Sequence, residues 1–485
     1  MTPRCLPLAL LSWALCAGGA AAQSHETPPP PGPPRALQID TPQEQRLDNG
    51  LRVIVARRAG VPIVSVRLLV RGGAELDPPG RAGLAALTAG LMTRGTRQRS
   101  APALARDVEA LGGSLDGSAG WDHARLGLTV TRPKLAPALA LLAEVAQQPA
   151  LAQDELDRLR DQVLDGLKIA QTRPGAVAGW AVQQAFYGSA GYGRPIDGTP
   201  ASLARVTRVD VQRLHRQVWQ PGRAVIVFAG DITLDDAVQL TRAHFGRWRA
   251  LPAAAGAVAP PAIRGPLPAP AQPLVIDMPG AGQAGVAVAV PGVSEGAPER
   301  HAAAVANAVL GQGYSSRLNQ EIRIKRGLSY GAGSALDVRA QGGALLVAVQ
   351  TKNASAAEVV QLIGAELDRL AAEPVAASEL AARKAALIGG FGRDAETSAG
   401  LAEQVAALAL AGLPLSELAE TIPRLQAVDA SEVQAFARER FAAEKRRLVV
   451  AGEAAEFAPA LKQADPRWRV LPASELQLDP PPQSR

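Results

Sequence analysis

The side chains that could bind a metal or act as nucleophiles are few in this chain of 485 residues. No two histidines lie within five residues of each other, so the chain has no local metal-binding pair of the H-x-x-x-H or H-x-H kind. It has no G-x-S-x-G motif, and both cysteines, Cys5 and Cys16, fall within the first 22 residues. The histidines are His25, His123 in a predicted strand, His215 and His244 on predicted helix surfaces, and His301. The residue types alone therefore predict no self-contained hydrolytic site.

One polar segment, SSRLNQEIRIKRGLSYGAGS (315–334), could bind a peptide group. Arg323 and Tyr330 are seven positions apart, and both can reach one cleft if a helix runs to about Lys325 and Gly327 turns the chain. An arginine fork and a tyrosine hydroxyl suit a peptide carbonyl or a developing oxyanion. An ordinary surface turn is the alternative. The glycine-rich LGQGYSSRL that overlaps this segment lacks the G-K-[S/T] ending of a phosphate loop and follows a predicted helix, which argues against a nucleotide site.

The elements predicted around these residues occur twice in the chain. Matching landmarks follow in the same order, four of the five pairs at an offset of 222 to 224 positions and the helix pair 83–92 and 300–310 at an offset of 217. They are the strands 51–55 and 274–278, the strands 63–70 and 285–290, the helices 83–92 and 300–310, the helices 154–167 and 378–391, and the closing strands 223–231 and 446–454. Such a regular offset favours an internal duplication.

Each copy begins with β-rich runs, continues with helices that carry Leu and Ala at three- to four-residue spacing, and returns to a strand. This order predicts an α+β fold of two homologous units, each a mostly antiparallel sheet covered on one face by helices. We place the first unit at 41–250, an Ala/Pro-rich linker at 251–273, the second unit at 274–470 and a C-terminal tail at 471–485.

The N-terminal segment is typical of an export signal. A single Arg4 precedes a short apolar stretch that ends in three alanines at Ala22. We therefore predict a signal peptide at 1–22, a Pro-rich spacer at 23–40 and a periplasmic location; an N-terminal anchor is the alternative. No later stretch approaches 18 apolar residues, so we predict no membrane span after cleavage. The 51 basic and 45 acidic residues are spread along the chain, which argues against nucleic-acid binding.

Four long motifs lie in order along the chain: LDNGLRVIVARRAGVPIVSVRLLVRGGAELDPPGRAGLA, GYGRPIDGTPASLARVTRVDVQRLH, WQPGRAVIVFAGDI and LGQGYSSRLNQEIRIKRGLSYGAGS. Together they resemble the pitrilysin/insulinase family of inverted-zincin metallopeptidases, which includes mitochondrial processing peptidase. The resemblance spans roughly 47–453, nearly all of the chain after the predicted signal. It implies pairs of homologous α+β units, in agreement with the duplication.

The zinc motif of that family is missing. Active members carry H-x-x-E-H, in which two histidines bind zinc and the glutamate is the general base. The matching stretch, GLAALTAGLMTRGT, has Ala86 and Gly90 at the histidine positions and Ala89 at the glutamate position. The family's third ligand is a glutamate on a later helix, and Gly166 stands there. The resemblance therefore implies that this chain holds no zinc.

The resemblance also implies a role for Arg323 and Tyr330. They match an arginine and a tyrosine that, in active members, face the zinc and hold the substrate. In two-subunit bacterial members one chain carries the zinc and the other carries this pair. We expect a non-catalytic subunit of a periplasmic heteromeric zinc metallopeptidase, which closes the chamber of a zinc-bearing homologous partner and binds unfolded peptides in trans.

Three alternatives stay open. The first is a peptidase-derived peptide-binding or scaffold protein with no catalytic role. The second is a homodimer in place of the heterodimer. The third is a hydrolase that works alone through an unrecognised site.

Overall fold

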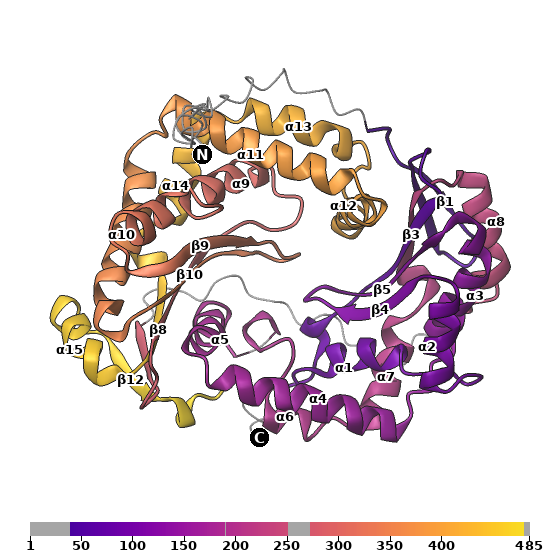
Figure 1. Ribbon diagram of the computed structural model, residues 1–485, viewed down its shortest axis with the longest axis horizontal. Helices are drawn as coiled ribbons and strands as arrows, with labels where there is room; N and C mark the ends of the chain where they lie inside the picture. Colours follow the sequence, from indigo (N-terminus) through magenta and orange to yellow (C-terminus); the bar gives the residue numbers. More distant parts are fainter. Residues whose placement is uncertain (1–38, 190, 251–271, 480–485) are drawn as a thin grey trace, which may run out of the picture. The chain divides into compact units, whose positions relative to one another are not determined.

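The computed structural model describes residues 39–189, 191–250 and 272–479, all within the compact unit Ile39–Arg485. Two six-stranded sheets form its framework, one from residues 43–230 and one from residues 274–472 (Figure 1). This confirms the predicted α+β class with two mostly antiparallel sheets. The predicted signal peptide, most of the spacer and all but the last two residues of the linker lie outside the described residues.

The two sheets share one topology. Their strand orders are β1-β2-β6-β3-β5-β4 and β12-β7-β11-β8-β10-β9, so that β2, β6, β3, β5 and β4 take the places of β7, β11, β8, β10 and β9. The first sheet consists of β1 Gln43–Arg46, β2 Arg52–Arg57, β3 Ile63–Arg71, β4 Ser114–Ala119, β5 His123–Thr131 and β6 Ala224–Gly230. The second consists of β7 Leu274–Asp277, β8 Ala284–Pro291, β9 Ser329–Asp337, β10 Ala344–Thr351, β11 Arg447–Gly452 and β12 Arg469–Pro472. The sixth strand differs, because β1 pairs antiparallel with β2 whereas β12 pairs parallel with β7.

The helices follow the same division. The first half contains α1 Leu84–Met92, α2 Ala101–Ala110, α3 Leu135–Gln147, α4 Gln153–Gln171, α5 Pro174–Tyr187, α6 Pro200–Leu203, α7 Arg208–Val218 and α8 Leu234–Phe245. The second contains α9 Arg300–Leu310, α10 Ala356–Ala372, α11 Ala377–Ala395, α12 Ser398–Ala411, α13 Glu417–Ala427, α14 Ala430–Arg440 and α15 Ala454–Ala464. Each predicted landmark of the duplication is thus confirmed to within a few residues. The predicted boundary at 470 falls inside β12, so ordered structure extends into the predicted tail.

One face of each sheet packs on helices of its own half, as predicted. In β3 the side chains of Val64, Val66 and Leu68 enter a core with α1, α3, α7 and α8. In β8 the side chains of Val286 and Val288 enter a core with α9, α10 and α14. Strand side chains alternate between faces, so each strand also presents an opposite face that must be covered.

The opposite face of each sheet is covered by one helix from the other half. α5 packs on β8 and β11 of the second sheet, and α12 packs on β3 and β6 of the first (Figure 1). The cause is visible in β6, AVIVFAG, which is buried along its whole length and therefore needs apolar partners on both sides. The sequence predicted helices on one face of each sheet, and the structure adds a helix on the opposite face. The two halves exchange a helix and share both cores.

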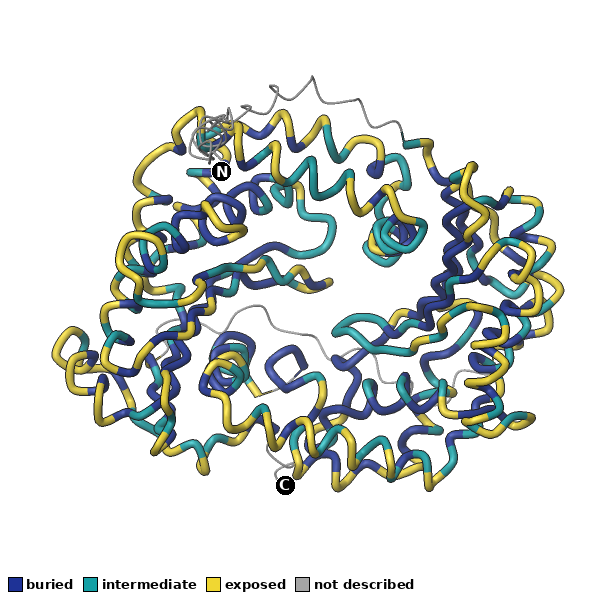
Figure 2. The backbone as a smooth tube through the Cα atoms, viewed as in Figure 1, coloured by how far each residue is buried: buried dark blue, intermediate teal, exposed yellow. Residues whose placement is uncertain are grey.

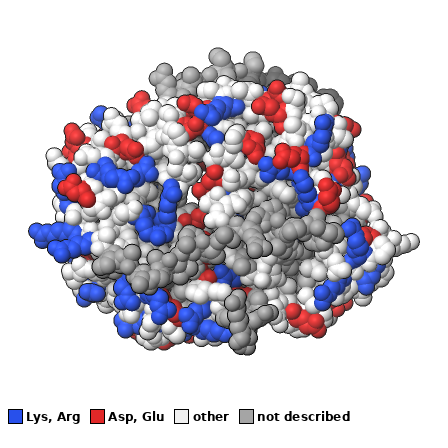
Figure 3. Space-filling view, turned by 180° about the vertical axis from the view of Figure 1, so that it is seen from behind, with Lys and Arg blue, Asp and Glu red and all other residues white. Residues whose placement is uncertain are grey.

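The exposed residues of the described chain gather on the outer turns of the helices, while most sheet strands are buried (Figure 2). The exceptions are β1, β4, β9 and β12, in which all or most residues are exposed or half-buried. On the face seen in Figure 3, basic and acidic side chains are interspersed. In the described segments, no helix combines the length and apolar character needed to cross a membrane.

Candidate functional site

The predicted zinc position lies on α1, and its side chains offer no metal donor. Ala86 and Gly90 are one turn apart and half-buried, and Ala89 is buried between them. A Cβ atom on Gly90 would lie 3.3 Å from Cδ2 of Leu159 on α4. An apolar side chain therefore borders the position that matches the second histidine of the zinc motif. The residues present therefore do not fit zinc.

The strand β4 passes close to the same helix. A Cβ atom on Gly117 would lie 2.4 Å from the carbonyl oxygen of Ala89, a distance that only glycine permits. On α4, Gly166 is two turns beyond Leu159 and hence on the same helix face. The adjacent Asp165 has a 72% exposed side chain and pairs with Lys168, so it points to solvent. Across residues 39–189, 191–250 and 272–479, no cluster of three or more His, Cys, Asp or Glu could hold a metal ion.

Arg323 and Tyr330 lie together in the second half. Arg323 is at the end of a π-helical turn, Asn319–Ile324, and Gly327 with φ +64° reverses the chain into β9. The guanidinium carbon of Arg323 is 4.9 Å from the ring centroid of Tyr330. The geometry expected from the spacing is thus present, with the helix ending at Ile324. The proposed role of the pair in substrate binding stays a prediction.

A third residue, Tyr314, completes this cluster and was missed by the sequence analysis. Its ring centroid is also 4.9 Å from the guanidinium carbon of Arg323, so the cation lies against two tyrosine rings. Tyr314 is 64% exposed and Tyr330 is 91% exposed. Tyrosine and arginine are among the residues enriched at protein–protein interfaces. The sequence feature that could have identified Tyr314 is its position as an aromatic residue in a glycine-rich loop just before the segment that carries Arg323.

Buried polar contacts hold the loop that carries Tyr314. Arg317 pairs with Glu379 of α11 at 2.8 Å, and Arg383 of the same helix donates to the Ser315 hydroxyl at 3.0 Å. Asn319 donates to the Tyr314 carbonyl, and its own carbonyl oxygen accepts the Ala332 N–H of β9 at 3.4 Å. The loop and the start of β9 are therefore fixed to each other. The rings that contact Arg323 stand on a braced backbone.

The charge of Arg323 has no carboxylate partner within the described chain, whereas its neighbours do. Glu321 pairs with Lys325 and Arg326, and the hydrogen bond from Lys325 holds the pKa of Glu321 below its usual range. A hollow of about 420 Å³ adjoins Tyr330, and its walls include Gln350 and Lys352. The cluster can thus donate hydrogen bonds to an incoming carbonyl or oxyanion without first breaking an ion pair.

The described histidines lie outside the Arg323 cluster, and packing contacts account for their positions. His123 begins β5, and burial lowers its pKa. His215 is not a plain helix-surface residue, since its Nε2 lies 2.9 Å from the Ala146 carbonyl oxygen and its ring stacks on Trp219. His244 is half-buried on α8, and His301 lies on α9. His25 is outside the described residues.

The chain thus contains two sheets that share the order of five strands, and the metal position next to the first sheet has no donors. The fold matches the crystal structure of a peptidase M16 inactive domain from Pseudomonas fluorescens, with a TM-score of 0.77 and 26% sequence identity over 85% of this chain and 98% of that one. It also matches a protease from Helicobacter pylori, with a TM-score of 0.78 and 21% identity over 85% of this chain and all of that one.

Sequence comparison gives the family. Residues 52–200 match the model for insulinase (peptidase family M16), and residues 205–387 match the model for the peptidase M16 inactive domain. An uncharacterized zinc protease of Mycobacterium leprae is 30% identical over 355 residues, which cover 71% of this chain and 77% of the relative. The chain belongs to the insulinase (peptidase M16) family.

Proposed function

We propose that this chain is a non-catalytic subunit of a periplasmic heteromeric zinc metallopeptidase. A zinc-bearing homologous partner supplies the metal and the general base. This chain closes the partner's chamber, and Arg323 and Tyr330 bind the peptide substrate and its transition state in trans. The observation that carries the proposal is the contrast between a metal position without donors and a braced cluster of unpaired donors in the same chain.

The start of β9 suits a peptide. β9 is the last strand of its sheet and is bonded only to β10 among the described strands. On its other edge the N–H groups of Ala332 and Ser334 already donate to Asn319 Oδ1 and to the Gly311 carbonyl oxygen, so an extended peptide would pair only with the start of the strand, at Tyr330. Such a strand would pass beside Tyr330 and the adjacent hollow, where Arg323 can donate to a peptide oxygen.

The test uses the complex purified from the native host with its zinc-bearing partner. Arg323→Ala should lower peptidase activity at saturating subunit by about 100-fold or more, because one donor to a transition-state oxyanion contributes roughly 3 kcal/mol. Assembly should not change. Arg326→Ala is the matched control, since Arg326 is a neighbouring arginine already paired with Glu321. Equal activity of the Arg323→Ala and wild-type complexes would refute the proposed role.

The alternative is a peptide-binding or scaffold protein without a catalytic role. Both functions allow peptide binding, so activity of the complex separates them. A complex that contains a zinc-bearing homologue and loses its activity when this chain is removed supports the subunit function. A complex without any such homologue, or one whose activity does not depend on this chain, supports the scaffold.

The proposal also states that the chain binds no zinc itself. The purified chain, incubated with excess zinc and then gel-filtered, should retain well below one zinc ion per molecule by elemental analysis. One tightly held zinc per chain would contradict the assignment of Ala86, Ala89, Gly90 and Gly166 as a degenerate metal position.

A further inference from the structure

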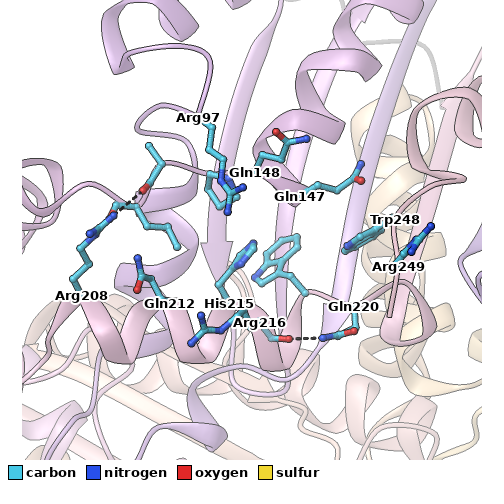
Figure 4. Close-up of a pocket in the computed structure, with 14 residues that line it drawn as sticks. Arg97, Gln147, Gln148, Arg208, Gln212, His215, Arg216, Gln220, Trp248 and Arg249 are labelled. Atoms are coloured by element: carbon cyan, nitrogen blue, oxygen red, sulfur yellow. Dashed lines mark hydrogen bonds between the residues drawn. The ribbon is translucent and has the colours of Figure 1, made fainter. Parts of the chain in front are cut away.

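A second cavity lies in the first half of the chain, on elements that contribute nothing to the Arg323 cluster. It has a volume of about 530 Å³, within the range of small-molecule sites (Figure 4). Its walls come from α7, from the loop between α3 and α4, from the loop after α1 and from the segment after α8. An isolated bridge between Thr96 and Pro149 holds two of these loops together.

One face of α7 forms the floor of the cavity. Arg208, Gln212, His215 and Arg216 recur at the spacing of a single helix face, and all four line the cavity. The opposite face of α7 is buried in the first core through Val211 and Leu214. The helix is thus anchored by its apolar side. Figure 4 shows the side chains of its polar side in the cavity.

The walls are cationic and contain no carboxylate. Four arginines line the cavity, together with four glutamines, and neither Asp nor Glu is present. None of these arginines forms an ion pair within residues 39–189, 191–250 and 272–479. The segment Leu251–Pro273, which follows the cavity wall in the sequence, has no acidic residue that could neutralise them. The four arginines are Arg97, Arg208, Arg216 and Arg249.

A strained backbone forms part of the wall. Leu151 has φ +44°, and no other described residue apart from glycine has a positive φ. A branched side chain in this region is costly, and such strain concentrates at binding sites. The carbonyl oxygen of Leu151 accepts a hydrogen bond from Nε of Arg208 at 2.6 Å. Nη2 of Arg208 also donates to the Ala150 carbonyl oxygen at 3.5 Å, so the strained turn fixes this arginine and leaves mainly its Nη1 for a ligand.

The remaining wall is flat and apolar. His215 stacks on Trp219 at 18° between ring planes, and Trp248 lines the cavity beside them. Because Nε2 of His215 donates to a backbone carbonyl, the neutral ring keeps Nδ1 as an acceptor. In Figure 4 the side chain of Arg97 extends from the opposite wall toward His215. Arg97 thus faces the polar side of α7 from the other wall of the cavity.

We propose that this cavity binds a small polyanion that carries phosphate groups. Arginine forks match phosphate oxygens in bidentate geometry, and four of them without carboxylates favour more than one negative charge. The amides of Gln148 and Gln212 can bind further polar groups of the ligand, whereas Gln147 and Gln220 already donate to the carbonyl oxygens of His244 and Arg216. The indole and imidazole rings can pack against the carbon skeleton of the ligand. The site is separate from the proposed peptide-binding cluster and does not depend on it.

Calorimetric titration of the full chain with inorganic pyrophosphate tests the proposal. We expect a dissociation constant of about 1 mM or below, because several charge-assisted hydrogen bonds form together. Arg97→Gln/Arg249→Gln should weaken binding at least tenfold, since each removes a fork that has no structural partner in the described chain. Arg208→Gln/Arg216→Gln should do the same from the floor of the cavity.

The matched control is Arg205→Gln/Arg242→Gln, which removes the same charge from exposed positions near α7 and on α8 that do not line the cavity. It should bind pyrophosphate within twofold of the wild type. Citrate tests whether carboxylates serve as well as phosphates. Absence of binding, equal weakening in the control, or tighter binding of citrate than of pyrophosphate would overturn the proposal.

Discussion

Two arginines flank β9, and both lie against aromatic rings, yet their surroundings differ in every other respect. Arg323, before the strand, is half-buried between two exposed tyrosines and has no carboxylate partner among the described residues. Arg339, after the strand, is 1% exposed. It lies within 5 Å of the ring centroids of Trp121, Tyr187 and Tyr192 and pairs with Asp337.

The difference separates a group available to a ligand from a group used by the fold. The three rings around Arg339 belong to the first half of the chain, whereas Arg339 belongs to the second. Nη1 of Arg339 also donates to the Tyr192 carbonyl at 3.0 Å, and Asp122 binds both the Tyr192 hydroxyl and the Ala340 N–H. Arginine stacking thus joins the two halves in one place and holds an unpaired cation at the surface in the other.

The largest expected effect is on stability, at Arg339. Arg339→Ala should lower the free energy of unfolding by about 3–5 kcal/mol, because Asp337 would lose its partner and three rings would border a cavity. Urea denaturation followed by circular dichroism measures this loss. Arg323→Ala, in the same assay, should cost less than about 1 kcal/mol. Similar losses for the two variants would remove the distinction between the two regions.

The next effect concerns the hydroxyl of Tyr330. Tyr330→Phe keeps the ring against Arg323 and removes one donor, so we expect peptidase activity of the complex to fall about 10- to 100-fold while stability stays within about 0.5 kcal/mol. Tyr187→Phe is the comparison in the buried region, where the hydroxyl lies 3.4 Å from the Gly342 carbonyl oxygen. There activity should be retained. A reversed pattern would contradict the division of roles.

A pH-dependent effect belongs to the buried region. Burial, together with the nearby charge of Asp122, raises the pKa of Glu75 to about 7 from an ordinary value of 4.5. The unfolded chain therefore ionises first, and the free energy of unfolding falls as pH rises from about 4.5 to about 7. The glutamine of Glu75→Gln can still accept the Gly73 N–H but does not titrate, so the variant lacks this pH dependence of the free energy of unfolding.

Relative to the wild type, the Glu75→Gln variant should gain on the order of 1–2 kcal/mol between pH 5 and pH 8. Denaturation curves at four pH values provide the measurement. A constant difference between variant and wild type across this range would show that Glu75 does not titrate in the folded protein.

The smallest effect is expected at Tyr314. Tyr314→Leu leaves Arg323 with one ring instead of two, and an exposed cation–π contact contributes about 0.5–1 kcal/mol. The kcat/KM of the complex should fall roughly two- to fivefold, because KM rises while kcat stays nearly unchanged. Ile324→Ala, at an exposed neighbour, serves as the control. A loss as large as that of Arg323→Ala would give Tyr314 a direct contact with the reacting group.

The sequence was informative wherever one half repeats the other. The helix predicted at 300–310 is α9 with the same bounds, and the closing strands are β6 and β11 within one or two residues. β1 was missed because its four residues, QEQR, are all polar and exposed, which leaves no apolar alternation to detect. β12 was missed because it is short and ends in proline.

The candidate site was only partly predictable for a similar reason. The proximity of Arg323 and Tyr330 could be predicted because the two residues are close in the sequence. The lack of metal donors on α1 could be predicted because the residue types alone show it. The contact of Tyr314 with Arg323 depends on how the loop after α9 folds back over the π-helical turn. The aromatic surroundings of Arg339 depend on three segments of the other half, and no local pattern indicates long-range contacts of this kind.

The exchange of α5 and α12 has a consequence for how the protein is made. The last strand of the first sheet ends at Gly230, but the helix that covers this sheet begins at Ser398. At translation rates of 5–20 residues per second, roughly ten seconds or more separate the two events. During that interval the nascent chain displays a bare apolar surface that only its own later residues can shield. Release of a truncated product before α12 therefore yields a species prone to aggregate, and folding is completed only after nearly the whole polypeptide has left the ribosome.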